Sequence, residues 1–148
     1  MRRPSFASLL LVLWMLASPS FAAEDGHVAL IKSVSGSVRV VRQATTLDAH
    51  AGDTLQVSDR LLAGPEATAA IVFVDGTLLT LGSGADIQLR DYVFEPRSSR
   101  YGFSLYLHKG SAIYSSGKIG KVAPESVKIE TPTATIGVRG TRFLVQAQ

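Results

Sequence analysis

Asp48, His50 and Asp53 are the residues whose types and spacing come closest to metal-binding chemistry. One imidazole nitrogen and two carboxylates form a ligand set that a divalent transition metal accepts. A solvated turn uses the same residue types, because an aspartate beside glycine accepts hydrogen bonds from exposed turn amides. We predict that Asp53 serves a turn at Gly52-Asp53 and that these residues hold no metal.

The other residues with catalytic potential are isolated from one another in the sequence. His27 lies near the N-terminus in a stretch that we expect to be flexible, and His108 alternates out of the apolar face of its segment. No serine stands in the Gly-x-Ser-x-Gly pattern of a nucleophile elbow. We therefore predict no catalytic residues, and an enzyme of unrecognised type remains an alternative.

Two glycine-containing segments match nucleotide-binding loops only in part. The segment 117–121, Gly-Lys-Ile-Gly-Lys, lacks the spacing that wraps a phosphate and indicates a mobile basic loop. The segment 82–84, Gly-Ser-Gly, is one part of a dinucleotide fingerprint with no helical segment after it, which indicates a turn. We predict no cofactor.

Asp75, Arg139 and Arg142 are polar residues placed at chain reversals. Asp75 precedes Gly76, and its carboxylate is suited to accept the amides of a tight turn. The two arginines flank Gly140, where a guanidinium either caps carbonyls, pairs with a turn aspartate, or forms a small cationic site for an acidic partner. Arg139 and Arg142 are the candidate partner-binding residues.

The elements that position these residues are short β segments. They are expected near residues 34–40, 54–57, 69–74, 77–81, 87–90, 103–107 and 112–114. Segments of four to six residues with turn signals about every ten residues, including Asp75-Gly76 and Lys109-Gly110, indicate an all-β domain. The continuous apolar run 69–74 fits a strand that is covered on both faces. We predict a β-solenoid-like or rolled sheet, with a β-sandwich as the alternative.

The C-terminal segment changes its apolar phase twice. The apolar residues stand at odd positions in Val127 and Ile129 and at even positions in Ala134, Ile136 and Val138. They return to odd positions in Phe143 and Val145. Each change requires a turn or a bulge, and Pro132 and Gly140 stand at the two places. We predict a turn at Pro132, a bulge at Arg139-Gly140-Thr141, and a last strand that lies inside a sheet, because a free terminal edge invites aggregation.

Residues 1–22 are predicted to be a cleavable signal peptide. Arg2 and Arg3 precede an apolar run, and Ser20-Phe21-Ala22 offers small residues where signal peptidase cuts. An uncleaved anchor is the alternative, but the run is shorter than the roughly 20 residues that cross a bilayer. The domain would then be residues 23–148, located in the periplasm or outside the cell, with no membrane span after cleavage.

The charge balance argues against a nucleic-acid partner, and the cysteine content excludes disulfides. Removing the two signal-peptide arginines from 15 Lys and Arg leaves 13 against 12 Asp and Glu, so no basic excess points to a nucleic acid. The chain has no cysteine, and an exported domain of this kind must be stabilised by burial and hydrogen bonds rather than disulfides. We predict that the protein does not bind nucleic acid.

Together the turns and strands resemble the FecR domain. The resemblance runs from about Val28 to Val145 and rests on Gly36, Gly52-Asp53-x-Leu55, the segment 69–81, Leu105-x-Leu107-x-Lys109-Gly110, Thr131-Pro132 and the segment 138–143, Val-Arg-Gly-Thr-Arg-Phe. The best-known members are inner-membrane regulators of iron uptake that control a sigma factor and have a β-rich, solenoid-like periplasmic part. We expect a stand-alone exported member instead, because no cytoplasmic segment precedes the hydrophobic run.

The resemblance and the absence of catalytic patterns imply a non-enzymatic periplasmic binding module of envelope signalling or assembly. Its expected partner is another envelope protein, contacted through an exposed sheet edge or the terminal strand. The alternative is a glycan or peptidoglycan binder that stacks sugars on Tyr101, Phe103, Tyr106 and Tyr114, provided that two or more of these rings face solvent.

Overall fold

The computed structural model describes residues 26–140 and 142–148, of which most lie in β-strands. The strands are β1 His27–Ser35, β2 Val38–Arg42, β3 Thr45–Asp48, β4 Thr54–Gln56, β5 Arg60–Ala63, β6 Thr68–Phe73, β7 Leu78–Leu81, β8 Asp86–Glu95, β9 Arg100–Ser115, β10 Val127–Glu130, β11 Thr135–Gly137 and β12 Arg142–Ala147. The helical elements are η1 Pro96–Ser98, α1 Lys118–Val122 and η2 Pro124–Ser126.

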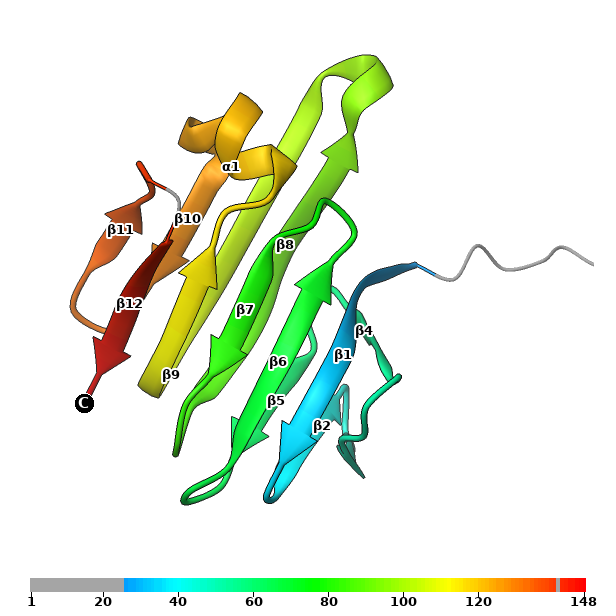
Figure 1. Ribbon diagram of the computed structural model, residues 1–148, viewed down its shortest axis with the longest axis vertical. Helices are drawn as coiled ribbons and strands as arrows, with labels where there is room; N and C mark the ends of the chain where they lie inside the picture. The colour runs from blue at the N-terminus through cyan, green and yellow to red at the C-terminus, as the bar shows by residue number, and fades with distance from the viewer. Residues whose placement is uncertain (1–25, 141) are drawn as a thin grey trace, which may run out of the picture.

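The strands form one sheet that curls into a half-barrel (Figure 1). Its order is β3-β2-β5-β8-β9-β7-β6-β1-β4, with β10 and β12 also paired to β9 and β11 paired to β10. The pairings are antiparallel, apart from the parallel pairing of β10 with β9. The predicted all-β class is confirmed, and of the predicted forms the sheet takes the rolled one.

Strand β9 belongs to both halves of the curled sheet. Its residues up to Lys109 pair with β8, whereas its residues from Ala112 to Ser115 pair with β7. Buried side chains of β9 occupy odd positions up to Leu107 and even positions from Ala112. The predicted turn at Lys109-Gly110 is therefore wrong: with φ +84°, Gly110 re-aims a continuous strand without ending it.

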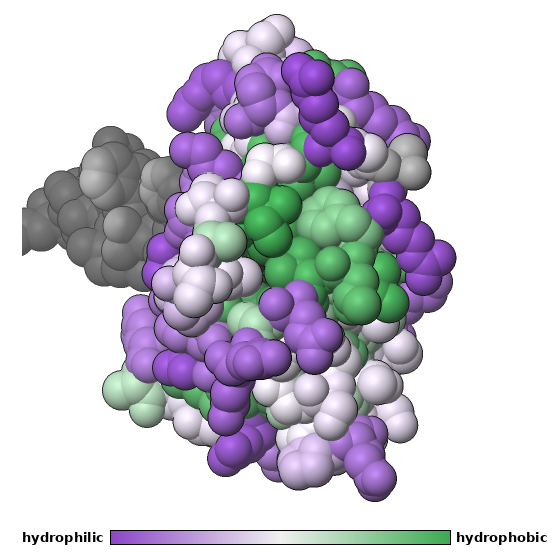
Figure 2. Space-filling view, turned by 90° about the vertical axis from the view of Figure 1, so that its left-hand side faces the viewer, coloured by the Kyte–Doolittle hydropathy of each residue, from purple (hydrophilic) through white to green (hydrophobic). Residues whose placement is uncertain are grey.

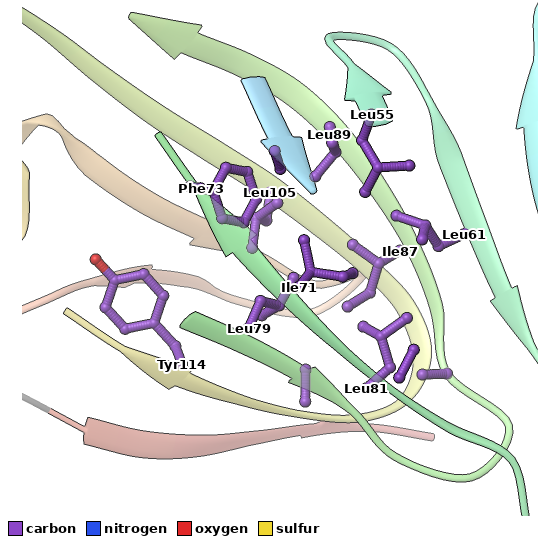
Figure 3. Packing of buried hydrophobic residues seen from close by; sticks show 14 of the residues in the cluster. Leu55, Leu61, Ile71, Phe73, Leu79, Leu81, Ile87, Leu89, Leu105 and Tyr114 are labelled. Carbon is purple, nitrogen blue, oxygen red and sulfur yellow. The ribbon is translucent and has the colours of Figure 1, made fainter. Parts of the chain in front are cut away.

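The core lies inside the curl, where side chains from β6, β7, β8 and β9 converge (Figure 3). Along β6, Ala69, Ile71 and Phe73 are buried, but Ala70 and Val72 between them are only half-buried. The prediction that the run 69–74 is covered on both faces is wrong, because no element within residues 26–140 and 142–148 forms a second layer over the outer face of the half-barrel (Figure 1). An apolar run does not by itself separate a two-sided strand from a one-sided strand with small or β-branched outer residues.

A side chain connects β2, the strand next to one end of the curled sheet, with β4 at the other end. Arg42 of β2 donates to the main-chain oxygen of Thr54 in β4 at 3.1 Å. The same guanidinium binds both carboxylate oxygens of Asp59, at 2.9 and 2.7 Å, and Asp59 is only 1% exposed. The Asp59 hydrogen bonds raise the pKa of Arg42 further above its ordinary value. Such bidentate, charge-assisted pairs are directional, so this contact holds the N-terminal side of the half-barrel together.

Candidate functional site

Asp75 is the centre of a buried polar network in the turn between β6 and β7. Its Oδ1 accepts hydrogen bonds from the Thr77 amide at 3.2 Å and the Tyr92 hydroxyl at 3.0 Å. Its Oδ2 accepts from Thr77 Oγ1 at 2.7 Å and from the Ile119 amide at 3.1 Å. Because Asp75 is 1% exposed and both oxygens face fixed donors, the carboxylate organises the turn rather than facing solvent.

The same network holds the segment 117–122 against the sheet. The Gly117 amide donates to Thr77 Oγ1 at 3.2 Å, and the Lys118 amide donates to the Asp75 carbonyl at 2.9 Å. Helix α1 begins there and buries Ile119 completely. The prediction of a mobile basic loop at 117–121 is wrong, because its first backbone amides are bound by Thr77 and Asp75, forty or more residues earlier in the chain.

Two tyrosines near Asp75 have raised pKa values. Burial, followed by the negative charge of Asp75, raises the pKa of Tyr92 well above its ordinary 10.0. Burial likewise raises the pKa of Tyr114, whose hydroxyl makes no hydrogen bond with the described residues. Both phenols therefore favour the neutral form in the folded protein.

These shifts predict a loss of stability at alkaline pH. A folded-state pKa above the unfolded value stabilises the fold below pH 10, and this contribution is lost as the pH rises towards the folded-state pKa. Urea unfolding measured at intervals above pH 9 should show a falling free energy of unfolding. In Tyr92→Phe the fall should be shallower, whereas an unchanged slope would contradict this role for Tyr92.

The aromatic residues proposed for sugar stacking are divided between the core and the surface. Phe103 and Tyr114 are buried and belong to a chain of packed rings that includes Phe73 and Phe143. Tyr101 and Tyr106 are half-buried, and the Arg90 guanidinium lies 4.0 Å from the centre of the Tyr106 ring. Phe103 and Tyr114 are therefore closed to a sugar.

The candidate metal residues lie at a turn. The His50 amide donates to Asp53 Oδ2 at 2.8 Å, and His50 Nδ1 lies 3.6 Å from the same oxygen. Asp48 ends β3, and within residues 26–140 and 142–148 no three His, Cys, Asp or Glu side chains are grouped as metal ligands. His108 packs against the Tyr106 ring. His27 was expected in a flexible stretch, but it begins β1 and pairs with Gln56.

The C-terminal turn residues lie on two connections. Pro132 is in the β10–β11 hairpin, where Thr131 Oγ1 accepts from the Ala134 amide at 3.1 Å. Gly140 lies between β11 and β12 with φ +136°, and its carbonyl accepts from Ser116 Oγ at 2.8 Å. Gly76 has φ +85° in the β6–β7 turn. Thr141 lies outside the described residues.

Strands β11 and β12 are both edges in the part of the chain that the structure describes. β11 pairs with β10 alone and β12 with β9 alone. The prediction that the last strand lies inside a sheet is wrong, because β12 pairs with β9 on one edge and no other described strand pairs with it. The β10–β11 hairpin extends the other half of the sheet, so the half-barrel is open on this side (Figure 1).

This open side, formed by β10, β11 and β12, carries a hydrophobic patch framed by polar groups (Figure 2). Ile136 and Phe143 are half-buried against the core, and the neighbouring Leu144, on the outward face of β12, is 63% exposed. Arg139 and Arg142 are exposed and form no ion pair with another described residue. The sequence marks the two arginines of this surface but not its free strand edges, because edge and internal strands share the same alternation.

The fold and this site define the protein as a rolled all-β domain with one open, apolar side. A family model for the FecR protein matches residues 59–148, and the chain belongs to the FecR family. The matched range begins after Gly36 and Gly52-Asp53-x-Leu55, the first motifs of the resemblance. No curated protein and no solved structure matches the chain. Among the residues described, no helix has the length and hydrophobicity to cross a membrane.

Proposed function

We propose that the protein is a non-enzymatic binding module of the cell envelope that contacts another envelope protein through its open side. FecR membership is consistent with an envelope signalling or interaction module. The observation that carries the proposal is the conjunction of two unpaired strand edges, β11 and β12, with an exposed hydrophobic patch. Contiguous apolar surface beside a free edge is typical of a protein interface.

The proposal includes export to the periplasm. The charged start, the apolar run and the small residues before Ala23 support cleavage of a signal peptide after Ala22. The protein would then act as a domain of residues 23–148 between the two membranes.

A site-specific crosslink in living cells tests the proposal. A photo-crosslinking amino acid, p-benzoylphenylalanine, placed at position 144 should capture one reproducible envelope protein, and the adduct should leave the cell with the periplasmic fraction. Leu144 suits the probe because it lies in the free-edge strand and is 63% exposed.

Position 74 provides the matched control. Val74 is 58% exposed, close to the exposure of Leu144, but it lies beside the β6–β7 turn, away from the open side. The probe at 74 should capture no dominant protein. Equal capture at both positions, or no reproducible adduct at 144, would overturn the proposed binding side.

A further inference from the structure

We infer that the open side receives an extended peptide segment of its partner, which adds to the free edge of β12 and carries carboxylates beside Arg139 and Arg142. This inference rests on the proposed function and specifies the chemistry of the partner. Addition of a strand to a sheet edge satisfies the unpaired backbone groups, while alternate side chains give specificity.

The first argument is the arrangement of β12 itself. Phe143 and Val145 turn towards the core, whereas Arg142, Leu144 and Gln146 face outwards. A strand added beside β12 would place its own alternate residues against these two sets. The added strand should place apolar side chains beside the inward-facing Phe143 and Val145, because Phe143 is only half-buried and Val145 is buried.

The second argument is charge. Residues 131–148 contain Arg139 and Arg142 and no aspartate or glutamate. In contrast, Arg42, Arg60, Arg90 and Arg100 each bind a carboxylate of this chain. A partner with acidic side chains would supply the missing counter-charges. A second copy would bring two cationic segments together instead, since β12 of each copy contributes only Arg142.

The third argument is space at the end of β12. A depression of about 310 Å³ lies between the hairpin residues Pro132 and Thr133 and the end of β12 at Gln146 and Ala147. An extended segment lying along β12 would reach it. A second depression of about 370 Å³ is lined by β10, β11 and the Val138-Arg139 connection, and also by Glu125, so it belongs to the β10–β11 hairpin rather than to β12.

Peptide binding to the protein purified from expression of the full chain tests the inference. The probe is a short fluorescent peptide in which valine alternates with glutamate or threonine, and its control carries lysine in place of glutamate. We expect fluorescence anisotropy to show binding of the acidic peptide and at least tenfold weaker binding of the basic one. Added salt should weaken the acidic complex.

Two double variants and a modified peptide test where and how the acidic peptide binds. The double variant Arg139→Gln/Arg142→Gln should bind the acidic peptide about tenfold more weakly, because it removes both cations that would pair with the peptide carboxylates. The exposed Arg39 and Arg97 lie away from the open side, so Arg39→Gln/Arg97→Gln should leave the affinity unchanged. A fully N-methylated acidic peptide, which has no amide donors, should not bind.

Several results would overturn the inference. They are equal binding of the acidic and basic peptides, retained binding of the N-methylated peptide, equal effects of the two double variants, or no binding of any peptide at millimolar concentration. Concentration-dependent dimerisation that the acidic peptide does not reverse would assign the edge to a second copy instead. Any of these results leaves the crosslink at position 144 as a separate test, so failure of the inference is distinguishable from failure of the proposed function.

Discussion

Replacing Gly110 by alanine is expected to lower the free energy of unfolding by about 4 kcal/mol. Gly110 has φ +84°, a conformation that costs an L-residue about 1–2 kcal/mol. The added Cβ would also lie 2.5 Å from the Cα and 2.6 Å from the nitrogen of Ala85. These are backbone atoms just before β8, so they cannot move aside as a flexible side chain does. Urea unfolding followed by circular dichroism measures the difference.

Gly76→Ala separates the clash from the backbone cost. Gly76 has nearly the same φ, +85°, but no atom lies within 4 Å of a Cβ built there. This variant should lose about 1 kcal/mol, the conformational cost alone. If the two variants lose the same stability, the close approach of β9 to Ala85 does not constrain the bend.

Replacing Asp75 by asparagine is expected to cost about 3 kcal/mol, although the side chain keeps its size. One carboxylate oxygen becomes an NH₂ group, which then faces donors instead of accepting from them. At Oδ2 these donors are Thr77 Oγ1 and the Ile119 amide, and at Oδ1 the Thr77 amide and the Tyr92 hydroxyl. The measurement is again urea unfolding, with trypsin cleavage after Lys118 or Lys121 as a local readout of helix α1.

Asp53→Asn is the matched control for this variant. The Asp53 side chain is 46% exposed and accepts one amide, that of His50, which an asparagine oxygen can also accept. Its expected loss is about 0.5 kcal/mol or less, without faster trypsin cleavage. A loss at Asp75 no larger than that at Asp53 would show that the buried network does not hold helix α1.

The sequence predicts this fold best where the cause is local. The turn at Gly52-Asp53 follows from a short side chain that bonds an amide three residues away, so its signal lies within one window. The hairpin around Pro132 similarly depends on Thr131 and Ala134. The all-β class follows from many such turns repeated along the chain.

Prediction fails where the cause is distant. Gly110 follows a lysine in a pattern typical of turns, and only the proximity of Ala85 distinguishes a bend inside β9 from a strand end. The fixed conformation of residues 117–122 depends on Asp75, whose hydrogen bond to the Ile119 amide spans 44 residues. The edge position of β12 likewise depends on which other strands reach it, and among the described strands only β9 does; the alternation of β12 does not encode this.

The position of β9 also determines the order in which this chain is able to fold. β9 supplies edges to β7, β8, β10 and β12, yet it consists of residues 100–115, late in the sequence. While the chain emerges from its N-terminus, β7 and β8 have no partner on those edges until β9 arrives. During this interval two strands are open to pairing with other chains, so the incomplete chain exposes strand edges that the finished domain covers.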